Sequence, residues 1–544
     1  MLVSAREECG TMNGTIAVQE DRVIGPPGTG KTTFLTQVIT HEASQRGSDA
    51  VVAVSHTRAA AAELAGRNAP IDRDNIATLH ALAYRAIDRP TVAEDTQHLR
   101  EFAEAYPQWQ FSSTRDPEDY AFGDVLGDDA IAEYGRLRNT LRPRELWPAD
   151  ILAFADAWER YKQETGTIDY SDMLEIAIHD TTCCTQDPEV MVVDEAQDMT
   201  RLQWQLVMHW AGAPNCEKLV TAGDPDQALY QWAGADTRWF QEHEPARRKV
   251  LEQSYRVPRA VHALALHWIR QCTDREDVVY HPRDAQGSVT RSPATYQHPE
   301  ALLDLIEGRK DHCPRAETSV MIMASCAYML QPLIALLRER GIPFSNPWRR
   351  KRGDWNPLHR GSSSTLAAIK AFCAPAVEGR VWTPEELMQW LGLTKQVLKR
   401  GGKDRIEAAL ASDETEEAVL QALCAEVSEE DFVESIAPLP RNLDWLQARL
   451  KVAKQKPAEY PLQLIRQHGM QVVDEEPSLY VGTCHSFKGG EADTVVIFPD
   501  LSSKGLQSWL GTDRDSVLRL YYVALTRARE NVILASAASG ASVW

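Results

Sequence analysis

The segment VIGPPGTGKTT, residues 23–33, decides how this chain folds. A short apolar run leads into a glycine-rich turn, and a helix-forming stretch follows it. The turn fits the pattern GxxxxGK(S/T), in which backbone N–H groups and the N-terminus of the following helix surround anionic phosphates. The lysine reaches the terminal phosphates, and the Ser/Thr hydroxyl ligates Mg²⁺. The segment therefore predicts a nucleotide-binding loop between a strand and a helix.

The residues expected to hold the nucleotide form one uninterrupted run. They are Gly25, Pro26, Pro27, Gly28, Thr29, Gly30, Lys31, Thr32 and Thr33. We expect Lys31 to be catalytic, because it can act on the terminal phosphate, and Thr32 to be a Mg²⁺ ligand. Taken alone, this run predicts an NTPase and leaves open what the hydrolysis drives.

A second segment, EVMVVDEAQD at residues 189–198, supplies carboxylates. Its apolar strand delivers two adjacent acids to the C-terminal end. Asp194 is suited to hold Mg²⁺, and Glu195 to position and deprotonate the attacking water. A solvent-exposed acidic turn is the alternative, but the apolar run and the accompanying phosphate loop favour catalysis.

The alternation of strand and helix extends outward from these segments. Strands are expected at 50–55, near 76, and at 190–193, 218–222, 319–323, 479–483, 494–498 and 531–535, and helices at 330–340 and 516–530. Mainly helical stretches interrupt the alternation at about 84–165 and 346–468. The sequence therefore predicts an α/β fold of two halves, each with a parallel sheet, flanking helices and a mainly helical insertion.

Length and composition describe a multidomain globular protein. The 544 residues, 43% hydrophobic and 25% charged, exceed what one core usually organises. No apolar run approaches the ~20 residues of a membrane span, and the N-terminus lacks a secretory core, so we expect a cytoplasmic protein. The ten scattered cysteines form no CxxC pair and are expected to be reduced. A net charge of −20 argues against a nonspecific nucleic-acid coat but allows a local basic groove.

Further motifs lie both before and after the acids at 194 and 195. DEAQD at 194–198 and GDPDQALYQWAGAD at 223–236 resemble consecutive motifs of the UvrD/Rep helicases of superfamily 1. Further segments resemble other motifs of that family: LEQSYRVP (251–258), GTCHSFKGGEADTVVI (482–497), LYYVALTRARE (520–530), VSHTRAAAAEL (54–64), ATLHALAYR (77–85) and DYSDML (169–174). Their order makes the chain similar to a compact helicase of this type.

The resemblance implies two RecA-like P-loop domains. It implies a first domain at 1–83 and 166–250 with an insertion at 84–165, and a second at 251–345 and 469–544 with an insertion at 346–468. It also implies a nucleoid-associated, DNA-stimulated ATPase that moves 3′ to 5′ on single-stranded DNA and unwinds duplexes at junctions, with ATP and Mg²⁺ as cofactors. Two alternatives stay open, a translocase that strips proteins without unwinding and a non-catalytic single-strand-binding protein.

The resemblance assigns further catalytic and nucleotide-binding roles. Gln227 matches the family's sensor of the γ-phosphate. Arg256 and Arg527 match arginines that stabilise the negative charge developing on it. Tyr255 resembles the residue that stacks on the adenine, and Glu491 resembles a ribose contact.

Contacts to the nucleic acid are also implied by the resemblance. Trp232 corresponds to the family's base-stacking tryptophan. Other expected contacts lie in motifs that touch the strand in relatives, namely Thr57, Arg58, His80, Thr483 and His485.

Several positions depart from the family pattern, among them Gly490 in place of the usual leucine of the segment 482–497. Gln19 lies too close to the phosphate loop to be the glutamine that reads adenine in the family, so recognition of the base is less constrained than the phosphate chemistry. Ser55 and Leu79 stand where the family often has aromatic residues, which predicts weaker base stacking in the first half.

Overall fold

The computed structural model describes residues 19–55, 61, 64–66, 69–112, 125–242, 244–307, 318–348, 355–358, 361, 364–411 and 415–544. Its contacts divide the chain into two compact units, residues 1–288 with 502–530 and residues 289–501 with 531–544. Each unit has a β-sheet flanked by helices, which confirms the predicted α/β class. The six domain boundaries implied by the resemblance stay a prediction. Within the described ranges, no helix combines the length and apolar character that a bilayer span needs.

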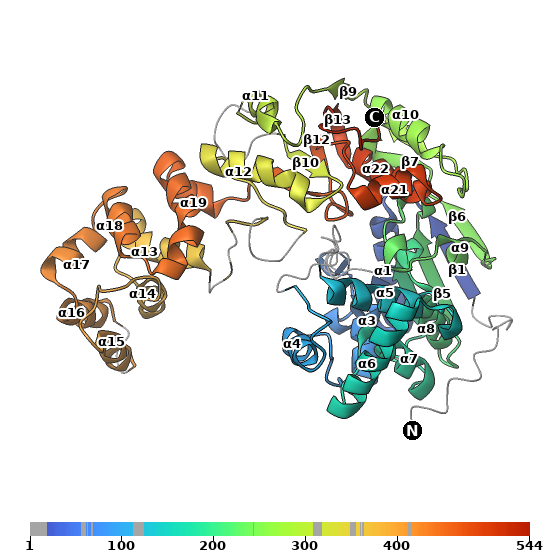
Figure 1. Ribbon diagram of the computed structural model, residues 1–544, viewed down its shortest axis with the longest axis horizontal. Helices are drawn as coiled ribbons and strands as arrows, with labels where there is room; N and C mark the ends of the chain where they lie inside the picture. Colours follow the sequence, from blue (N-terminus) through green and yellow to red (C-terminus); the bar gives the residue numbers. More distant parts are fainter. Residues whose placement is uncertain are drawn as a thin grey trace. The chain divides into compact units, whose positions relative to one another are not determined.

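A six-stranded parallel sheet forms the centre of the first unit (Figure 1). Its strands, in spatial order, are β3 (Ile76–Thr78), β2 (Val51–Ser55), β4 (Val190–Asp194), β5 (Lys218–Gly223), β1 (Gln19–Ile24) and β6 (Arg247–Val250). Neighbouring strands all run parallel. β2 and β4 are buried along their whole length, as their apolar sequences require of central parallel strands.

Helices cover both faces of this sheet. α1 (Lys31–Arg46) packs Leu35 and Ile39 into the core on one face. Four helices contribute to the core on the other face, namely α3 (Leu79–Ala86), α7 (Tyr170–Asp180), α8 (Arg201–Ala211) and α9 (Thr237–Glu242). Because the strands are parallel, their C-terminal ends share one edge, and ligands of such sheets bind at that edge.

Three helices between β3 and β4 form a small core of their own. They are α4 (Thr96–Ala105), α5 (Leu126–Asn139) and α6 (Ala149–Thr165). Phe102 and Trp158 meet edge to face at its centre, with ring centroids 5.0 Å apart. This segment confirms the helical stretch predicted before residue 165.

A buried ionic cluster joins this helical segment to α7. The buried side chains of Arg138 and Lys162 both face the buried carboxylate of Asp169. Asp169 also caps α7 by accepting a hydrogen bond from Asp172 N–H at 2.8 Å. Burial alone would raise the pKa of the Asp169 carboxyl, but the charges of Lys162 and Arg138 outweigh it and hold that pKa well below its usual range.

We expect Asp169→Asn to lower the free energy of unfolding by about 3 to 5 kcal/mol, because it leaves two buried cations without this carboxylate while retaining a helix cap. Since the folded-state pKa is depressed, the carboxylate's contribution is complete above the unfolded pKa of about 4 and is lost as the pH falls through the folded value. Urea unfolding at neutral and acidic pH measures both effects.

The matched control is Asp95→Asn at the exposed cap of α4. Asp95 is exposed and accepts a hydrogen bond from His98 N–H at 2.8 Å. Its loss should cost under about 1 kcal/mol. Equal losses for the two variants would contradict a role for the buried charge.

The first unit also contains elements from later in the chain. β7 (Gln253–Pro258) pairs in parallel with β8 (His281–Arg283). α10 (Arg259–Ile269) packs on α22 (Arg514–Leu525). α21 (Ser503–Leu510) precedes α22, and its Trp509 stacks on Trp268 of α10 with ring centroids 5.9 Å apart. Through these contacts, the segments 253–288 and 502–530 belong to the unit that holds the phosphate loop.

The predicted helix at 516–530 is too long. α22 ends at Leu525, and strand β13 (Ala528–Leu534) begins three residues later. The Thr526 hydroxyl donates to the carbonyl of Tyr522 at 2.9 Å where the chain leaves the helix. No glycine or proline marks this boundary in the sequence. Arg527 therefore lies in the turn between helix and strand, and not on the surface of a helix.

The second unit is built on a five-stranded sheet. Its order is β11 (Leu479–Thr483), β10 (Val320–Ala324), β12 (Ala492–Ile497), β13 and β9 (Ser288–Arg291). β10 runs parallel to both β11 and β12. The helices α11 (Leu303–Glu307) and α12 (Gln331–Arg340) share its core. The strands predicted at 319–323, 479–483 and 494–498 and the helix at 330–340 are confirmed to within a residue or two.

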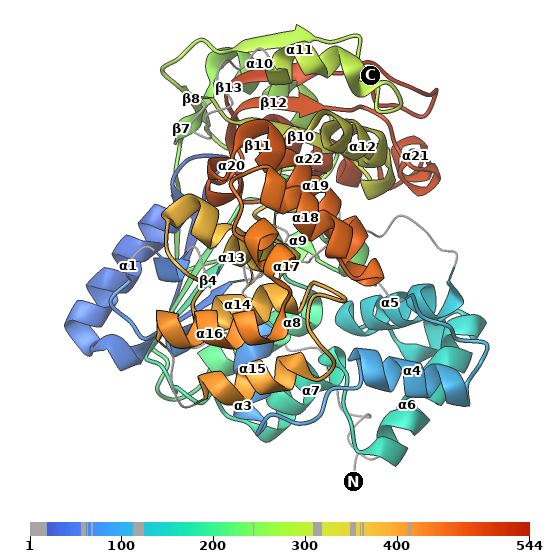
Figure 2. The same ribbon diagram turned by 90° about the vertical axis from the view of Figure 1, so that its left-hand side faces the viewer.

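The other α-helices described in the second unit gather into one group, drawn in yellow and orange in Figures 1 and 2. They are α13 (Thr365–Glu378), α14 (Pro384–Leu391), α15 (Gly402–Leu410), α16 (Glu416–Glu426), α17 (Glu429–Ser435), α18 (Arg441–Arg449), α19 (Val452–His468) and α20 (Gln471–Asp474). Phe372 stacks on Trp445 with centroids 5.7 Å apart, which ties α13 to α18. This group confirms the predicted helical stretch after residue 346.

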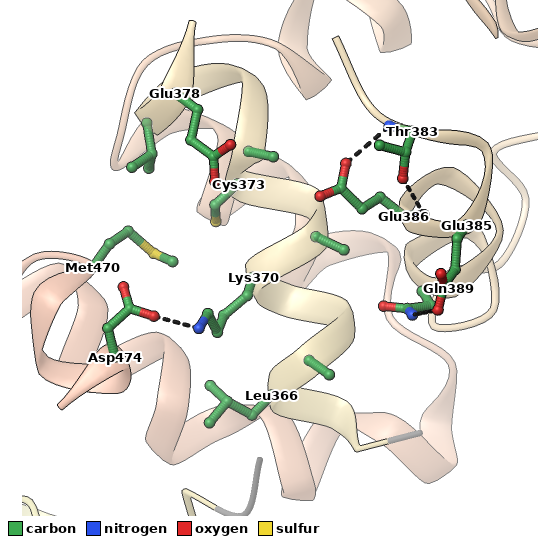
Figure 3. A pocket seen from close by; sticks show the side chains of 14 residues that line it. Leu366, Lys370, Cys373, Glu378, Thr383, Glu385, Glu386, Gln389, Met470 and Asp474 are labelled. Atoms are coloured by element: carbon green, nitrogen blue, oxygen red, sulfur yellow. Dashed lines mark hydrogen bonds and ion pairs between the residues drawn. The ribbon is translucent and has the colours of Figure 1, made fainter. Parts of the chain in front are cut away.

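Helices α13, α14 and α20 line an open pocket of about 440 Å³ (Figure 3). Lys370 forms an ion pair with Asp474 across it, and Gln389 donates to Glu385 at 3.0 Å. Its polar groups thus satisfy one another. Among the residues that the structure describes, none of the predicted site residues lines this pocket.

Candidate active site

The phosphate loop follows β1 directly and turns tightly into α1. Gly25 N–H donates to the carbonyl of Gly223 at 3.0 Å, which ties the loop to the end of β5. The Lys31 ammonium folds back and donates to the carbonyl of Gly25 at 2.6 Å. A Cβ at Gly25 would lie 2.2 Å from Lys31 Cγ, and Gly28 has a φ of +72°, so both positions require glycine. α1 starts directly after Gly30 and has no side-chain cap. The positive end of its helix dipole therefore faces the loop.

The paired carboxylates lie at the C-terminal end of β4. Asp194 is buried, and its Oδ1 accepts a hydrogen bond from Glu195 N–H at 2.9 Å. Glu195 has a φ of +53° and a ψ of +40°, a left-handed conformation that costs about 1 to 3 kcal/mol for a residue with a side chain. Such strain persists only where the surroundings hold it, and it is common at functional sites.

Gln197 links these carboxylates to the end of β5. Its amide nitrogen donates to Glu195 Oε2 at 2.5 Å, and its amide oxygen accepts from Asp224 N–H at 2.9 Å. A Cβ on the preceding Gly223 would lie 2.6 Å from that amide oxygen. The ends of β4 and β5 are therefore fastened by one buried side chain.

A hydrogen-bonded chain runs from Asp224 to Arg527. Asp224 Oδ2 accepts from Gln227 Nε2 at 2.6 Å, and Gln227 Oε1 accepts from Arg527 Nη2 at 2.9 Å. All three side chains are buried, and Arg527 is 2% exposed. Burial raises the pKa of Asp224, while the nearby charge of Lys31 lowers it. Two predicted residues, Gln227 and Arg527, are thus in direct contact near the phosphate-loop lysine.

The segment that carries Arg256 docks on the phosphate loop. Tyr255 N–H donates to the carbonyl of Gly28 at 2.8 Å. The hydroxyl groups of Ser254 and Tyr280 both donate to the carbonyl of Pro27 at 2.9 Å. Strand β7 and the residue just before β8 therefore hold one side of the loop through its backbone oxygens.

This docking places Arg256 next to the loop and leaves the side chain of Tyr255 exposed to solvent. A Cβ at Gly28 would lie 2.4 Å from Arg256 Cβ. Tyr255 is 74% exposed, so its ring is accessible to solvent. An exposed ring beside a phosphate loop is available for stacking.

Two family models match the chain. The model of the UvrD/REP helicase N-terminal domain matches residues 15–246, and the model of the UvrD-like helicase C-terminal domain matches residues 478–535. Together they cover just over half of the chain. The chain belongs to the UvrD/REP helicase family.

Curated relatives within this family are distant. The ATP-dependent DNA helicase UvrD2 of Mycobacterium tuberculosis (strain ATCC 25618 / H37Rv) is 25% identical over 296 residues, 45% of this chain and 40% of the relative. The ATP-dependent DNA helicase PcrA of Leuconostoc citreum is 25% identical over 312 residues, 51% of this chain and 41% of the relative. A probable DNA helicase II homolog of Mycoplasma pneumoniae is 23% identical over 605 residues, 94% of this chain and 81% of the relative. The chain thus spans about two fifths of the length of the first two.

Two of the residues that the UvrD/REP resemblance assigns to nucleic acid lie in the first unit with aromatic neighbours. Trp232 is half-buried in the 3₁₀ turn Gln231–Ala233, with its ring centroid 6.3 Å from that of Tyr230. His80, at the start of α3, meets Tyr170 edge to face at 5.8 Å, and Tyr170 is 48% exposed. Two further predicted contacts lie outside the described residues, Thr57 and Arg58.

The remaining predicted residues belong to the second unit. Thr483 ends β11 fully buried, and its Oγ1 accepts from Ser486 N–H at 3.2 Å, so its side chain is used within a turn. His485 lies in the same turn, where burial lowers its pKa to about 4, with a smaller effect from the charge of Lys488. Glu491 is half-buried just before β12.

The site of this UvrD/REP-family protein fits a triphosphate with Mg²⁺. The loop at Gly25 and Gly28 is a cradle that a Cβ would fill. Thr32 and Asp194 would hold the ion, since Mg²⁺ in nucleotide sites takes few protein oxygens and completes its shell with phosphate and water. In the part of the chain that the structure describes, no group of three or more His, Cys, Asp or Glu side chains has a metal-binding arrangement.

Sequence reasoning missed residues that connect the motifs. Asp224 stands in the segment GDPDQALYQWAGAD, and Gln197 stands in DEAQD. Both residues thus lie in recognised motifs, but the sequence did not indicate what either of them does. Ser254 likewise stands in LEQSYRVP. Tyr280 lies outside every quoted motif and carries no signal in the sequence.

Proposed function

We propose that this chain is a DNA-stimulated ATPase that moves 3′ to 5′ along single-stranded DNA and unwinds duplex DNA. The observation that carries the proposal is the hydrogen bond from Arg527 to Gln227 at 2.9 Å. It joins the last motif of the chain to the end of β5, where Gly223 also binds the phosphate loop. Family membership supports the same activity.

Four charged side chains act on the phosphates and the attacking water in this proposal. Lys31 binds the terminal phosphate, and Glu195 takes the proton of the attacking water. Arg256 and Arg527 stabilise the negative charge that develops on the γ-phosphate. Thr32 and Asp194 would hold Mg²⁺, which would neutralise negative charge on the nucleotide phosphates.

The exposed Tyr255 ring is proposed to stack on the base of the nucleotide, with Glu491 as a ribose contact. Stacking accepts any base, because every base has an apolar face. Because Gln19 lies too close to the phosphate loop to read adenine, Tyr255 is proposed to be the main base contact, and GTP should compete with ATP more effectively than a base-reading site would allow.

Single-stranded DNA is proposed to bind through aromatic side chains, which contribute about 1 to 3 kcal/mol per stacked base. Trp232 is the expected platform, with His80 as a neighbouring contact. Thr57, Arg58 and His485 are proposed to contact the backbone. Thr483 has a buried side chain, and its carbonyl accepts from the Ser486 hydroxyl at 2.9 Å, so its proposed role is to hold the turn that carries His485.

The first experiment measures ATP hydrolysis with and without single-stranded DNA. We expect DNA to stimulate the wild type and Lys31→Ala to lower the stimulated kcat by about 10²- to 10³-fold, as the loss of one preorganised donor does. Lys451→Ala is a matched control, because Lys451 also donates to a glycine carbonyl, that of Gly392 at 2.8 Å, at an exposed place. Equal, low turnover in all conditions would refute the motor.

The second experiment separates unwinding from translocation alone. Blunt, 3′-tailed and 5′-tailed duplexes are offered with ATP, and unwinding is expected only from the 3′ tail. Unwinding only from the 5′ tail would overturn the polarity. Release of a protein roadblock from single strands without duplex separation would identify the stripping translocase, and DNA binding without hydrolysis would identify a non-catalytic binder.

A further inference from the structure

Arg275 contacts the turn that carries Gln227, although Arg275 lies outside every sequence motif named above. It belongs to the loop between α10 and β8. Its Nε donates to Asp226 Oδ2 at 2.9 Å, and both side chains are 8% exposed. Asp226 immediately precedes Gln227 in the 3₁₀ turn Pro225–Gln227. A buried guanidinium therefore holds the residue next to the γ-phosphate sensor.

The loop that carries Arg275 is fastened to α22. The Asp515 carboxylate accepts hydrogen bonds from Thr273 N–H and from the Thr273 hydroxyl, both at 2.9 Å, and from Asp274 N–H at 3.0 Å. Arg519 donates to the carbonyl of Asp274 at 2.5 Å. Arg275 is thus positioned by the helix that leads to Arg527.

These contacts close into a ring. Asp226 N–H donates to Asp224 Oδ1 at 3.1 Å, and Asp224 binds Gln227, which accepts from Arg527. Arg527 Nε donates back to the carbonyl of Val523 in α22 at 3.0 Å. Two connections thus join α22 to Gln227. One runs through the loop of Arg275, and the other runs through Arg527, so a shift of α22 would act on Gln227 through both.

We propose that Arg275 is a positioning residue that holds Asp226, and through it Gln227, in register with Arg527. The proposal rests on the proposed ATPase function and adds a residue to it. A guanidinium suits this task because its hydrogen bonds to a carboxylate are directional as well as charged. Without Arg275, the buried carboxylates of Asp226 and Asp224 would repel each other with one cation fewer to hold them.

Asp226 also gives the ring a measurable titration. It faces Asp224 on its own segment, Arg275 and Cys272 from the loop after α10, and Arg519 and Tyr522 from α22. Burial and the charge of Asp224 raise the pKa of Asp226 to about 7, against the opposing effects of Arg275 and Arg519. Because the ion pair needs the carboxylate, turnover should rise as the pH passes upward through neutrality.

The test is the pH profile of single-stranded-DNA-stimulated ATP hydrolysis by the full chain. Arg275→Met is expected to lower kcat by about 10- to 100-fold through misplacement of Gln227. It should also move the acid limb of the profile upward by about 1 to 3 pH units, the effect of a close opposite charge on a carboxyl. Arg275→Lys keeps a cation and should leave the acid limb close to that of the wild type.

The matched control is Arg248→Met, which breaks the exposed pair with Glu276, the next residue of the same loop. It should retain the wild-type rate and profile. An unchanged acid limb in Arg275→Met overturns the inference even if kcat falls, because a general structural defect lowers the rate alike at every pH.

If Arg275→Met does not fold, Asp226→Asn decides the question. The amide cannot titrate, so the acid limb should disappear in that variant, and its persistence overturns the inference. A wild type without DNA-stimulated ATPase overturns the proposed function and this inference together. A stimulated wild type with unaltered variants overturns the inference alone.

Discussion

Arg527→Met is expected to lower the DNA-stimulated kcat for ATP hydrolysis by about 10³- to 10⁵-fold, the effect of arginines that stabilise a transferring γ-phosphate. The guanidinium is buried and held by Gln227 Oε1 at 2.9 Å and by the Val523 carbonyl at 3.0 Å. A donor fixed in this way needs no reorganisation when charge develops, so its loss should act on kcat far more than on nucleotide affinity. Steady-state hydrolysis and equilibrium binding of a fluorescent ATP analogue measure the two effects.

The control for this prediction lies on α22, the helix that precedes Arg527. Arg514, at the start of α22, stacks over Trp509 with its guanidinium carbon 4.5 Å from the ring centroid, at an exposed place. Arg514→Met should turn over ATP at the wild-type rate. Arg527→Lys should fall between the two, because an ammonium keeps the charge but not the planar fork. A loss in Arg527→Met no larger than in Arg514→Met would remove Arg527 from the catalytic set.

Local patterns in the sequence were sufficient to predict the phosphate loop and the central strands. The run at 190–193 is apolar at every position and ends in acids, which is typical of a buried parallel strand that delivers carboxylates. The glycines at 25 and 28 are needed because side chains there would collide with Lys31 and Arg256. At Gly25 the physical cause lies within a few residues of its signal, whereas at Gly28 it is a side chain from a distant segment of the chain.

Long-range contacts explain what the sequence could not predict. The end of α22 at Leu525 is a case of this kind, because the apolar and helix-favouring residues continue past it and β13 takes over at Ala528. Arg275 is another. Its partner Asp226 lies 49 residues earlier in the chain, and nothing in the local sequence around Arg275 distinguishes it from a surface arginine. Such pairings follow from tertiary packing, which a single sequence does not display.

Glu195, whose backbone is strained, is the second residue whose replacement should strongly affect ATP hydrolysis. Glu195→Gln is expected to lower kcat by about 10²- to 10⁴-fold while preserving ATP affinity, because the amide keeps the shape of the side chain but cannot take a proton from water. Its oxygen can still accept the hydrogen bond that Gln197 now makes to Glu195 Oε2 at 2.5 Å, so the orientation should persist. Single-turnover hydrolysis, compared with nucleotide binding, separates the chemical step from binding.

The matched control is Glu189→Gln at the opposite end of the same strand, where the carboxylate is 35% exposed and pairs with Arg46 at 2.8 Å. That variant should hydrolyse ATP at the wild-type rate, since it is far along β4 from the phosphate loop. Reduced affinity in Glu195→Gln would mean that the carboxylate holds the nucleotide rather than the water. Normal turnover would mean that another group activates the water, and the left-handed backbone at Glu195 would then serve only the hydrogen bond to Gln197.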